Sequence, residues 1–132
     1  MKRSSSPSPG SWGRERGAAA VEFALVAPIL LSLVAGIVEF SYTYNLQISV
    51  TQAAREAART MAIQNNQGLA RSAAAAGAPG LSPAGFTYTF SPAACSPNSN
   101  VTVNITYVAN SLTSLFGNSV TIRGTGAMRC GG

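Results

Sequence analysis

A long apolar run with a carboxylate near its start dominates the N-terminal part of the sequence. The run covers residues 17–40 and reads GAAAVEFALVAPILLSLVAGIVEF. Residues 23–38 carry no charge, and with residues 18–21 the run reaches the roughly 20 residues that a membrane-spanning helix needs. Pro28 lies inside the run, and such a proline is tolerated in a lipid-embedded helix. The sequence therefore predicts a transmembrane helix at residues 18–39.

The few charged residues indicate how this helix is oriented. They make up only 10% of the chain, and the residues before the run carry an excess of positive charge, from Lys2, Arg3, Arg14 and Arg16 against Glu15. The positive-inside rule then predicts a cytoplasmic N-terminus and an exported chain after Val38. Residues 1–17 read as a cytoplasmic leader, and the Ser-, Pro- and Gly-rich residues 1–13 are expected to be disordered. Because topology accounts for the basic residues, we expect no nucleic-acid partner.

The residue inventory argues against catalysis. The chain contains no His and no Asp, and Lys2 is its one Lys. It therefore lacks the usual general bases, a cluster of metal ligands, and a pair of carboxylates outside the apolar run. We expect no enzymatic activity, no cofactor, no metal site and no small-molecule substrate.

The start of the run resembles the cleavage motif of type IV prepilins. Gly17 is followed by Ala-Ala-Ala-Val and then by Glu22 and Phe23. The wider pattern, RGAAAVEFALVAPILLSLVAGIVEF with QISVTQAAREAARTMA after it, resembles the TadE-like pseudopilins of tight-adherence (Flp) pilus systems. This resemblance implies cleavage between Gly17 and Ala18 by a prepilin peptidase, residence in the bacterial inner membrane, and partners among other pilin and assembly subunits. It covers roughly residues 16–61, and the C-terminal half shows no family motif.

Glu22 has a physical role in this interpretation. A charged side chain within a membrane helix is a candidate functional residue. Cleavage after Gly17 would give Ala18 a free α-ammonium group, and four residues at 1.5 Å each put Glu22 about 6 Å deeper. The ammonium of one subunit would then pair with Glu22 of a staggered neighbour and fix their register. The alternative is a carboxylate near enough to the lipid headgroups to stay hydrated.

The helical pattern continues beyond the apolar run, over residues 40–76. Apolar residues recur on one helix face, namely Leu46, Val50, Ala53, Ala54, Ala57 and Met61. Gln52, Arg55, Glu56 and Arg59 lie on the opposite face. The narrow apolar stripe is suited to packing on the chain's own sheet or on a partner helix. Tyr42 and Tyr44 fit either a membrane interface or ordinary packing. Residues 65–68, Asn-Asn-Gln-Gly, predict a helix end.

Residues 77–132 read as a small β domain. Strands are predicted at residues 86–90, 101–108 and 119–129, from alternating apolar and polar side chains. Gly124 and Gly126 suggest bulges in the third strand, and residues 111–116 suggest one helical turn. The predicted fold class is therefore α+β. A long N-terminal helix, membrane-spanning in its first half and exported and amphipathic in its second, packs on an antiparallel sheet of about three strands.

Cys95 and Cys130 are the chain's two cysteines, and both fall in the part predicted to be exported. In an oxidising compartment such a pair predicts a disulfide. It would tie the loop after the first strand to the end of the third. Free thiols or a lipidated cysteine fit less well, because neither cysteine follows a signal cleavage point.

These features favour a minor pilin or pseudopilin of a tight-adherence pilus, processed after Gly17. Two alternatives stay open. In the first, residues 34–36, Val-Ala-Gly, serve as an ordinary signal-peptidase site and release a small exported binding domain. In the second, the chain stays uncleaved as a single-pass membrane accessory protein.

Overall fold

The computed structural model describes residues 12–131, with side chains from Glu15 onward, and divides into two compact units, Met1–Ile37 and Val38–Gly132. Residues 1–11, which make up most of the predicted leader and of its predicted disorder, lie outside the described residues. The helix α1, Trp12–Gln64, begins within the predicted leader and passes through both units. Pro28 lies inside α1.

The first unit exposes its apolar side chains. Residues 23–37 of this unit carry no charged side chain on any side of α1. Large apolar side chains are exposed over more than half of their surface, among them Val21, Phe23, Leu25, Ile29, Leu31 and Leu33. A helix that is apolar all round requires an apolar environment around it. Helix α1 contains a stretch that is long enough and apolar enough to cross a membrane.

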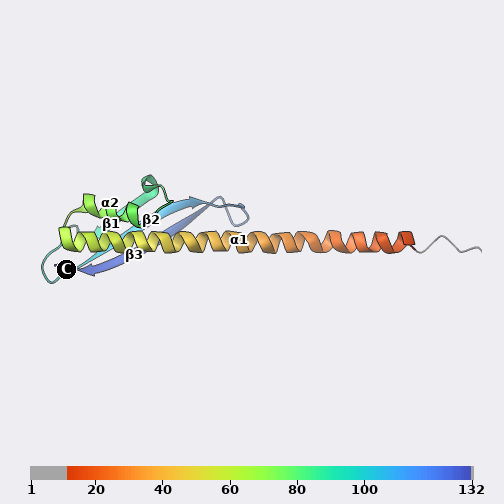
Figure 1. Cartoon of the computed structure of the whole chain (residues 1–132), viewed down its shortest axis with the longest axis horizontal. Helices are drawn as coiled ribbons and strands as arrows, with labels where there is room; N and C mark the ends of the chain where they lie inside the picture. Colours follow the sequence, from red (N-terminus) through yellow and green to blue (C-terminus); the bar gives the residue numbers. More distant parts are fainter. Residues whose placement is uncertain (1–11, 132) are drawn as a thin grey trace, which may run out of the picture. The chain divides into compact units, whose positions relative to one another are not determined.

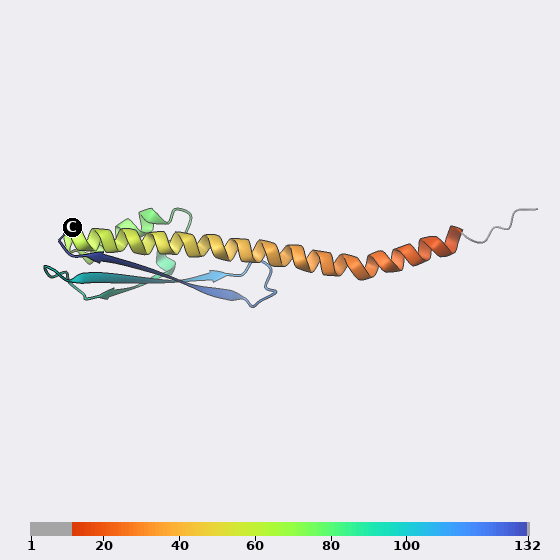
Figure 2. The same ribbon diagram turned by 90° about the horizontal axis from the view of Figure 1, so that it is seen from below.

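The second unit is an α+β domain, as the sequence predicts. Its sheet has three antiparallel strands in the order β1-β2-β3, with β1 at Phe86–Ser91, β2 at Asn100–Asn110 and β3 at Ser119–Arg129. The second helix, α2, covers Gln67–Gly77, and a short 3-10 helix, η1, covers Pro83–Gly85. The C-terminal part of α1, coloured yellow to green, runs along the sheet in both views (Figures 1 and 2).

The core lies between this part of α1 and one face of the sheet. The predicted apolar stripe of α1 is buried along its length, at Leu46, Val50, Ala53, Ala54, Ala57 and Met61. Val101, Val103 and Ile105 of β2 face it and are fully buried, as their alternation predicts. The stripe therefore packs on the chain's own domain, and the opposite helix face, with Arg55 and Arg59, is exposed.

The prediction of bulges at Gly124 and Gly126 is wrong. The pairing of β2 with β3 runs without interruption from Asn100 opposite Arg129 to Asn110 opposite Ser119. The two glycines instead mark the closest approach of helix and sheet, because a Cβ at Gly124 would overlap the carbonyl oxygen of Val50 and one at Gly126 that of Ala54. Small residues on both elements allow this contact between backbones.

The break between the two helices falls where the sequence predicts it, at Asn65 and Asn66. Asn65 adopts a left-handed backbone conformation (φ 47°), and Asn66 caps α2 by accepting a hydrogen bond from the N–H of Leu69. Of the four residues predicted to end the helix, only Asn65 and Asn66 form the break, and Gln67 and Gly68 already belong to α2. The predicted helical turn at residues 111–116 is wrong, because these residues form bends and a turn between β2 and β3.

Candidate functional site

A buried carboxylate lies near the start of the second unit. Glu39 is 4% exposed, and among the described residues it is the one charged side chain that is buried. Its two oxygens accept hydrogen bonds from the β2–β3 loop: the N–H of Leu112 lies 3.1 Å from each of them. The N–H of Thr113 is 2.9 Å from Oε2, and the Thr113 hydroxyl is 3.0 Å from the same oxygen. Charge-assisted bonds of this kind are among the stronger ones in proteins.

The loop that binds Glu39 covers residues 111–118 and has a defined shape. The N–H of Ser111 donates to the carbonyl of Asn118 at 3.1 Å, which closes the loop where β2 ends and β3 begins. The Ser111 hydroxyl oxygen accepts a hydrogen bond from the N–H of Ser114 at 2.9 Å. This turn leaves the N–H groups of Leu112 and Thr113 without partners inside the loop, so they are free to converge on the Glu39 carboxylate.

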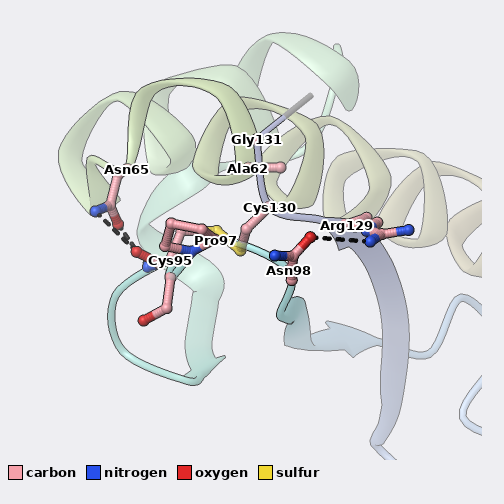
Figure 3. A pocket seen from close by; sticks show the side chains of 9 residues that line it. Ala62, Asn65, Cys95, Pro97, Asn98, Arg129, Cys130 and Gly131 are labelled. Carbon is pink, nitrogen blue, oxygen red and sulfur yellow. Dashed lines mark hydrogen bonds between the residues drawn. A yellow bond between two sulfur atoms is a disulfide. The ribbon is translucent and has the colours of Figure 1, made fainter.

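The opposite end of the domain carries the disulfide. The structure joins Cys95 and Cys130, whose Cα atoms are 5.6 Å apart, and so ties the β1–β2 loop to the end of β3 as predicted (Figure 3). The Asn65 side chain holds the same loop, since its Oδ1 accepts from the N–H of Cys95 at 2.6 Å and its Nδ2 donates to the Cys95 carbonyl at 3.3 Å. The end of α1, the loop and the C-terminal strand thus meet at one point.

An open depression lies beside the disulfide. It is lined by residues from the end of α1, the β1–β2 loop and the end of β3, and its polar side chains are those of Asn65, Ser96, Asn98 and Arg129 (Figure 3). Arg129 donates a hydrogen bond to Oδ1 of Asn98 at 3.1 Å, so its guanidinium group is already engaged. Within residues 12–131, no three His, Cys, Asp or Glu side chains gather to hold a metal ion. Neither observation points to a bound ligand.

The predicted processing and assembly residues lie in the first unit. Gly17 and Ala18 are adjacent in α1, Glu22 follows about one turn later, and all three are exposed. Apart from its chain neighbours and the adjoining helix backbone, no other atom of the described residues lies within 4 Å of the place where a Cβ of Gly17 would stand. Their surroundings within the chain therefore leave them accessible to another protein. Their roles in cleavage and in charge pairing stay predictions.

Two groups of aromatic residues differ in their environments. Tyr42 packs half-buried against the core, whereas Tyr44 is exposed and stacks with Phe40 at 6.3 Å between ring centres. On the sheet, the guanidinium carbon of Arg71 lies 5.3 Å from the ring centre of Tyr88. Burial raises the pKa of the Tyr88 phenol, and the positive charge of Arg71 opposes this shift in part.

Sequence reasoning missed the role of Glu39. It identified Glu39 only as the end of the apolar run, and the groups that bind it lie 73 and 74 residues further along. An acidic residue directly after an apolar run is common at a membrane surface. The residues near Glu39 in the sequence do not indicate which groups its carboxylate binds. The available signal was the serine- and threonine-rich loop between two predicted strands, since the hydroxyls of these residues favour turns by bonding to nearby backbone groups.

Comparison with known proteins gives one match. Residues 17–59, a third of the chain, match the model of the family described as TadE-like protein, which confirms the resemblance seen in the sequence. The matched segment begins at Gly17 and includes Glu22 and Glu39. That family is structural and related to pili. No curated protein and no solved structure matches the chain.

Proposed function

We propose that this chain, which carries a TadE-like segment at residues 17–59, is a minor pilin or pseudopilin that serves as a structural or assembly subunit of a tight-adherence pilus. The observation that supports this most directly is where the match begins. It starts at Gly17, the residue after which a prepilin peptidase would cut, and contains Glu22 at the fifth position of the processed chain.

In this proposal the first unit anchors the protein in the bacterial inner membrane with its N-terminus in the cytoplasm. Residues 18–39 form the membrane helix, residues 40–76 the exported helical segment and residues 77–132 the disulfide-tied β domain. The exposed apolar side chains of α1, such as Phe23 and Leu31, support the anchor, because lipid supplies the apolar surroundings that the chain itself does not. A position of Glu39 at the outer edge of the span fits this proposal, since the loop supplies hydrogen bonds to its carboxylate in place of water.

Assembly in this proposal depends on Glu22. Cleavage would free the α-ammonium group of Ala18, and a neighbouring subunit's Glu22 would neutralise it in poorly hydrated surroundings. Both residues are exposed on α1, which leaves them available to a neighbour. The partners are then the prepilin peptidase during maturation, and other pilin and tight-adherence subunits afterwards.

The N-terminal residue of the protein recovered from its native envelope tests the proposal. Edman sequencing or intact mass should give Ala18 as the first residue. In cells that lack the prepilin peptidase, the chain should instead be recovered uncleaved. An intact Met1 in cells that contain the peptidase would contradict processing and would favour the uncleaved single-pass accessory protein.

One structural observation supports the alternative of a released domain. The compact second unit begins at Val38, two residues after the Val-Ala-Gly sequence at 34–36. Cleavage by an ordinary signal peptidase after Gly36 would therefore leave the β domain and its helix whole as a small exported binding domain. An N-terminal Ile37 in the same measurement would favour this alternative and remove Glu22 from the mature protein.

A further inference from the structure

The β2–β3 loop exposes three large apolar side chains. Leu112 is 56% exposed, Leu115 is 55% exposed and Phe116 is 77% exposed, the highest value among the large apolar side chains described. Isolated exposed apolar residues are common on protein surfaces, but three within five residues at the tip of one loop form a patch. Each of the three presents more than half of its surface to solvent.

The patch is carried by a loop that is ordered and uncharged. The Ser111–Asn118 backbone bond and the Ser114–Ser111 side-chain bond fix its shape. Residues 108–122 contain no charged side chain, so no charge of the loop's own opposes its transfer from water to a less polar medium. The bound Glu39 carboxylate has its oxygens hydrogen-bonded by the loop. Its serine and threonine residues keep polar groups beside the apolar ones, a mixture suited to the headgroup region of a bilayer.

Glu39 fixes the position of the loop along α1. Its carboxylate binds Leu112 and Thr113, and Glu39 directly follows the uncharged residues 23–38. The loop therefore lies beside the helix turn at which the apolar run ends, and Figure 2 shows the β2–β3 connection next to α1. Phe40, adjacent to Glu39, is 73% exposed and adds an aromatic side chain at the same level. Aromatic residues are enriched at this depth in membrane proteins.

We propose that the loop at 111–118 is a second membrane contact, in which Leu112, Leu115 and Phe116 enter the lipid interface on the exported side of the membrane. This inference rests on the membrane anchor of the proposed function. The occupant is lipid because Glu39, which directly follows the uncharged residues 23–38, holds the loop at its own level on α1. The apolar face of an interfacial segment typically enters about 5–10 Å. The Glu39 bonds would hold the domain's membrane-facing end at a fixed height on the helix.

Fluorescence quenching by brominated lipids tests this contact on the full-length chain. The protein is reconstituted into vesicles of phosphatidylethanolamine and phosphatidylglycerol that contain phosphatidylcholine brominated near the headgroup. A Trp12→Phe background removes the native indole, and Phe116→Trp places one at the loop tip. This change keeps an exposed aromatic side chain in place, so the fold is preserved.

Two further variants in the same background serve as controls. Leu31→Trp reports on the apolar run itself. Ile63→Trp occupies a site that is also exposed, at 61%, but lies about 36 Å along the helix from Glu39, as 24 residues at 1.5 Å each. We expect the emission of the Phe116→Trp and Leu31→Trp variants to shift to shorter wavelength and to lose intensity in brominated lipid, while the Ile63→Trp variant is unchanged.

Each other outcome overturns a defined claim. Quenching of the Leu31→Trp variant without quenching of the Phe116→Trp variant would overturn the second contact and leave the anchor standing. Absence of quenching at both sites would contradict the anchor on which the inference rests. If the Phe116→Trp indole is shielded from aqueous acrylamide only at high protein-to-lipid ratio and is never quenched by lipid, a second copy of the chain covers the patch, and the lipid contact is wrong.

Discussion

Glu39 and Thr113 are 74 residues apart in the sequence, yet the carboxylate of the first accepts hydrogen bonds from both the N–H and the hydroxyl of the second. The pair joins the helix to the β2–β3 loop at one end of the domain. At the other end, Asn65 and the Cys95–Cys130 disulfide join the helix, the β1–β2 loop and β3. The helix and sheet are thus held together at both ends of their shared core.

Replacing Glu39 with Gln should loosen the loop while leaving the core intact. The amide keeps the side chain's shape but exchanges one acceptor oxygen for an NH₂ group that faces N–H donors. We expect faster hydrogen exchange at the amides of Leu112 and Thr113 and a lower unfolding midpoint, with a larger loss for Glu39→Ala.

Glu56→Gln is the matched control, because Glu56 is an exposed carboxylate on the same helix. It should leave both measurements unchanged. Equal exchange rates in the Glu39→Gln variant and the unmodified protein would show that the loop keeps its shape without the carboxylate.

Gly126→Ala should destabilise the domain by about 1–3 kcal/mol, the usual cost of adding a methyl group to a fully packed interior. The new Cβ would overlap the backbone carbonyl of Ala54, so helix and sheet must separate. Ala127→Ser adds one heavy atom to the next residue, which is exposed, and serves as the control. Urea unfolding of both variants measures the difference, and equal midpoints would contradict the close approach.

The buried face of β2 and the buried stripe of α1 were predictable because their signals are local. Alternation in β2 and helical spacing from Leu46 to Met61 each report which side of one element faces the core. The two glycines of β3 were misinterpreted because a glycine within a strand is typical both of a bulge and of a close approach between the strand and another backbone. The Glu39 contact was not predictable, since it depends on how a turn distant in sequence directs its N–H groups.

Loss of the disulfide should cost roughly 4 kcal/mol, since the cross-link spans 35 residues and restricts the unfolded chain accordingly. Cys95→Ser/Cys130→Ser should therefore unfold at clearly lower denaturant concentration. Non-reducing mass spectrometry of protein from the native envelope should show the two cysteines in one linked peptide pair. Two alkylatable thiols in that protein would contradict the cross-link in the cell.

Glu22→Ala should leave membrane insertion intact or improve it, because a carboxylate costs roughly 2.5–3.5 kcal/mol at the centre of a bilayer and less towards its edge. Assembly should be impaired, since the proposed partner of the Ala18 ammonium is lost. Membrane fractionation and surface pilus counts measure the two effects.

Glu15→Ala is the control for that change, because cleavage after Gly17 would remove residue 15 from the assembled subunit. It should leave surface pili at the level of the unmodified protein. Normal piliation in the Glu22→Ala variant would exclude the pairing role.

The β2–β3 loop lies between Cys95 and Cys130 in the sequence, and this order matters when the loop is cut. A single proteolytic nick at residues 111–118 would divide the polypeptide in two, but the disulfide would keep β3 covalently attached to the fragment that holds the helix. The nicked protein would migrate as one species until a reductant is added. A chain with this arrangement would keep its last strand after a single cut in this loop.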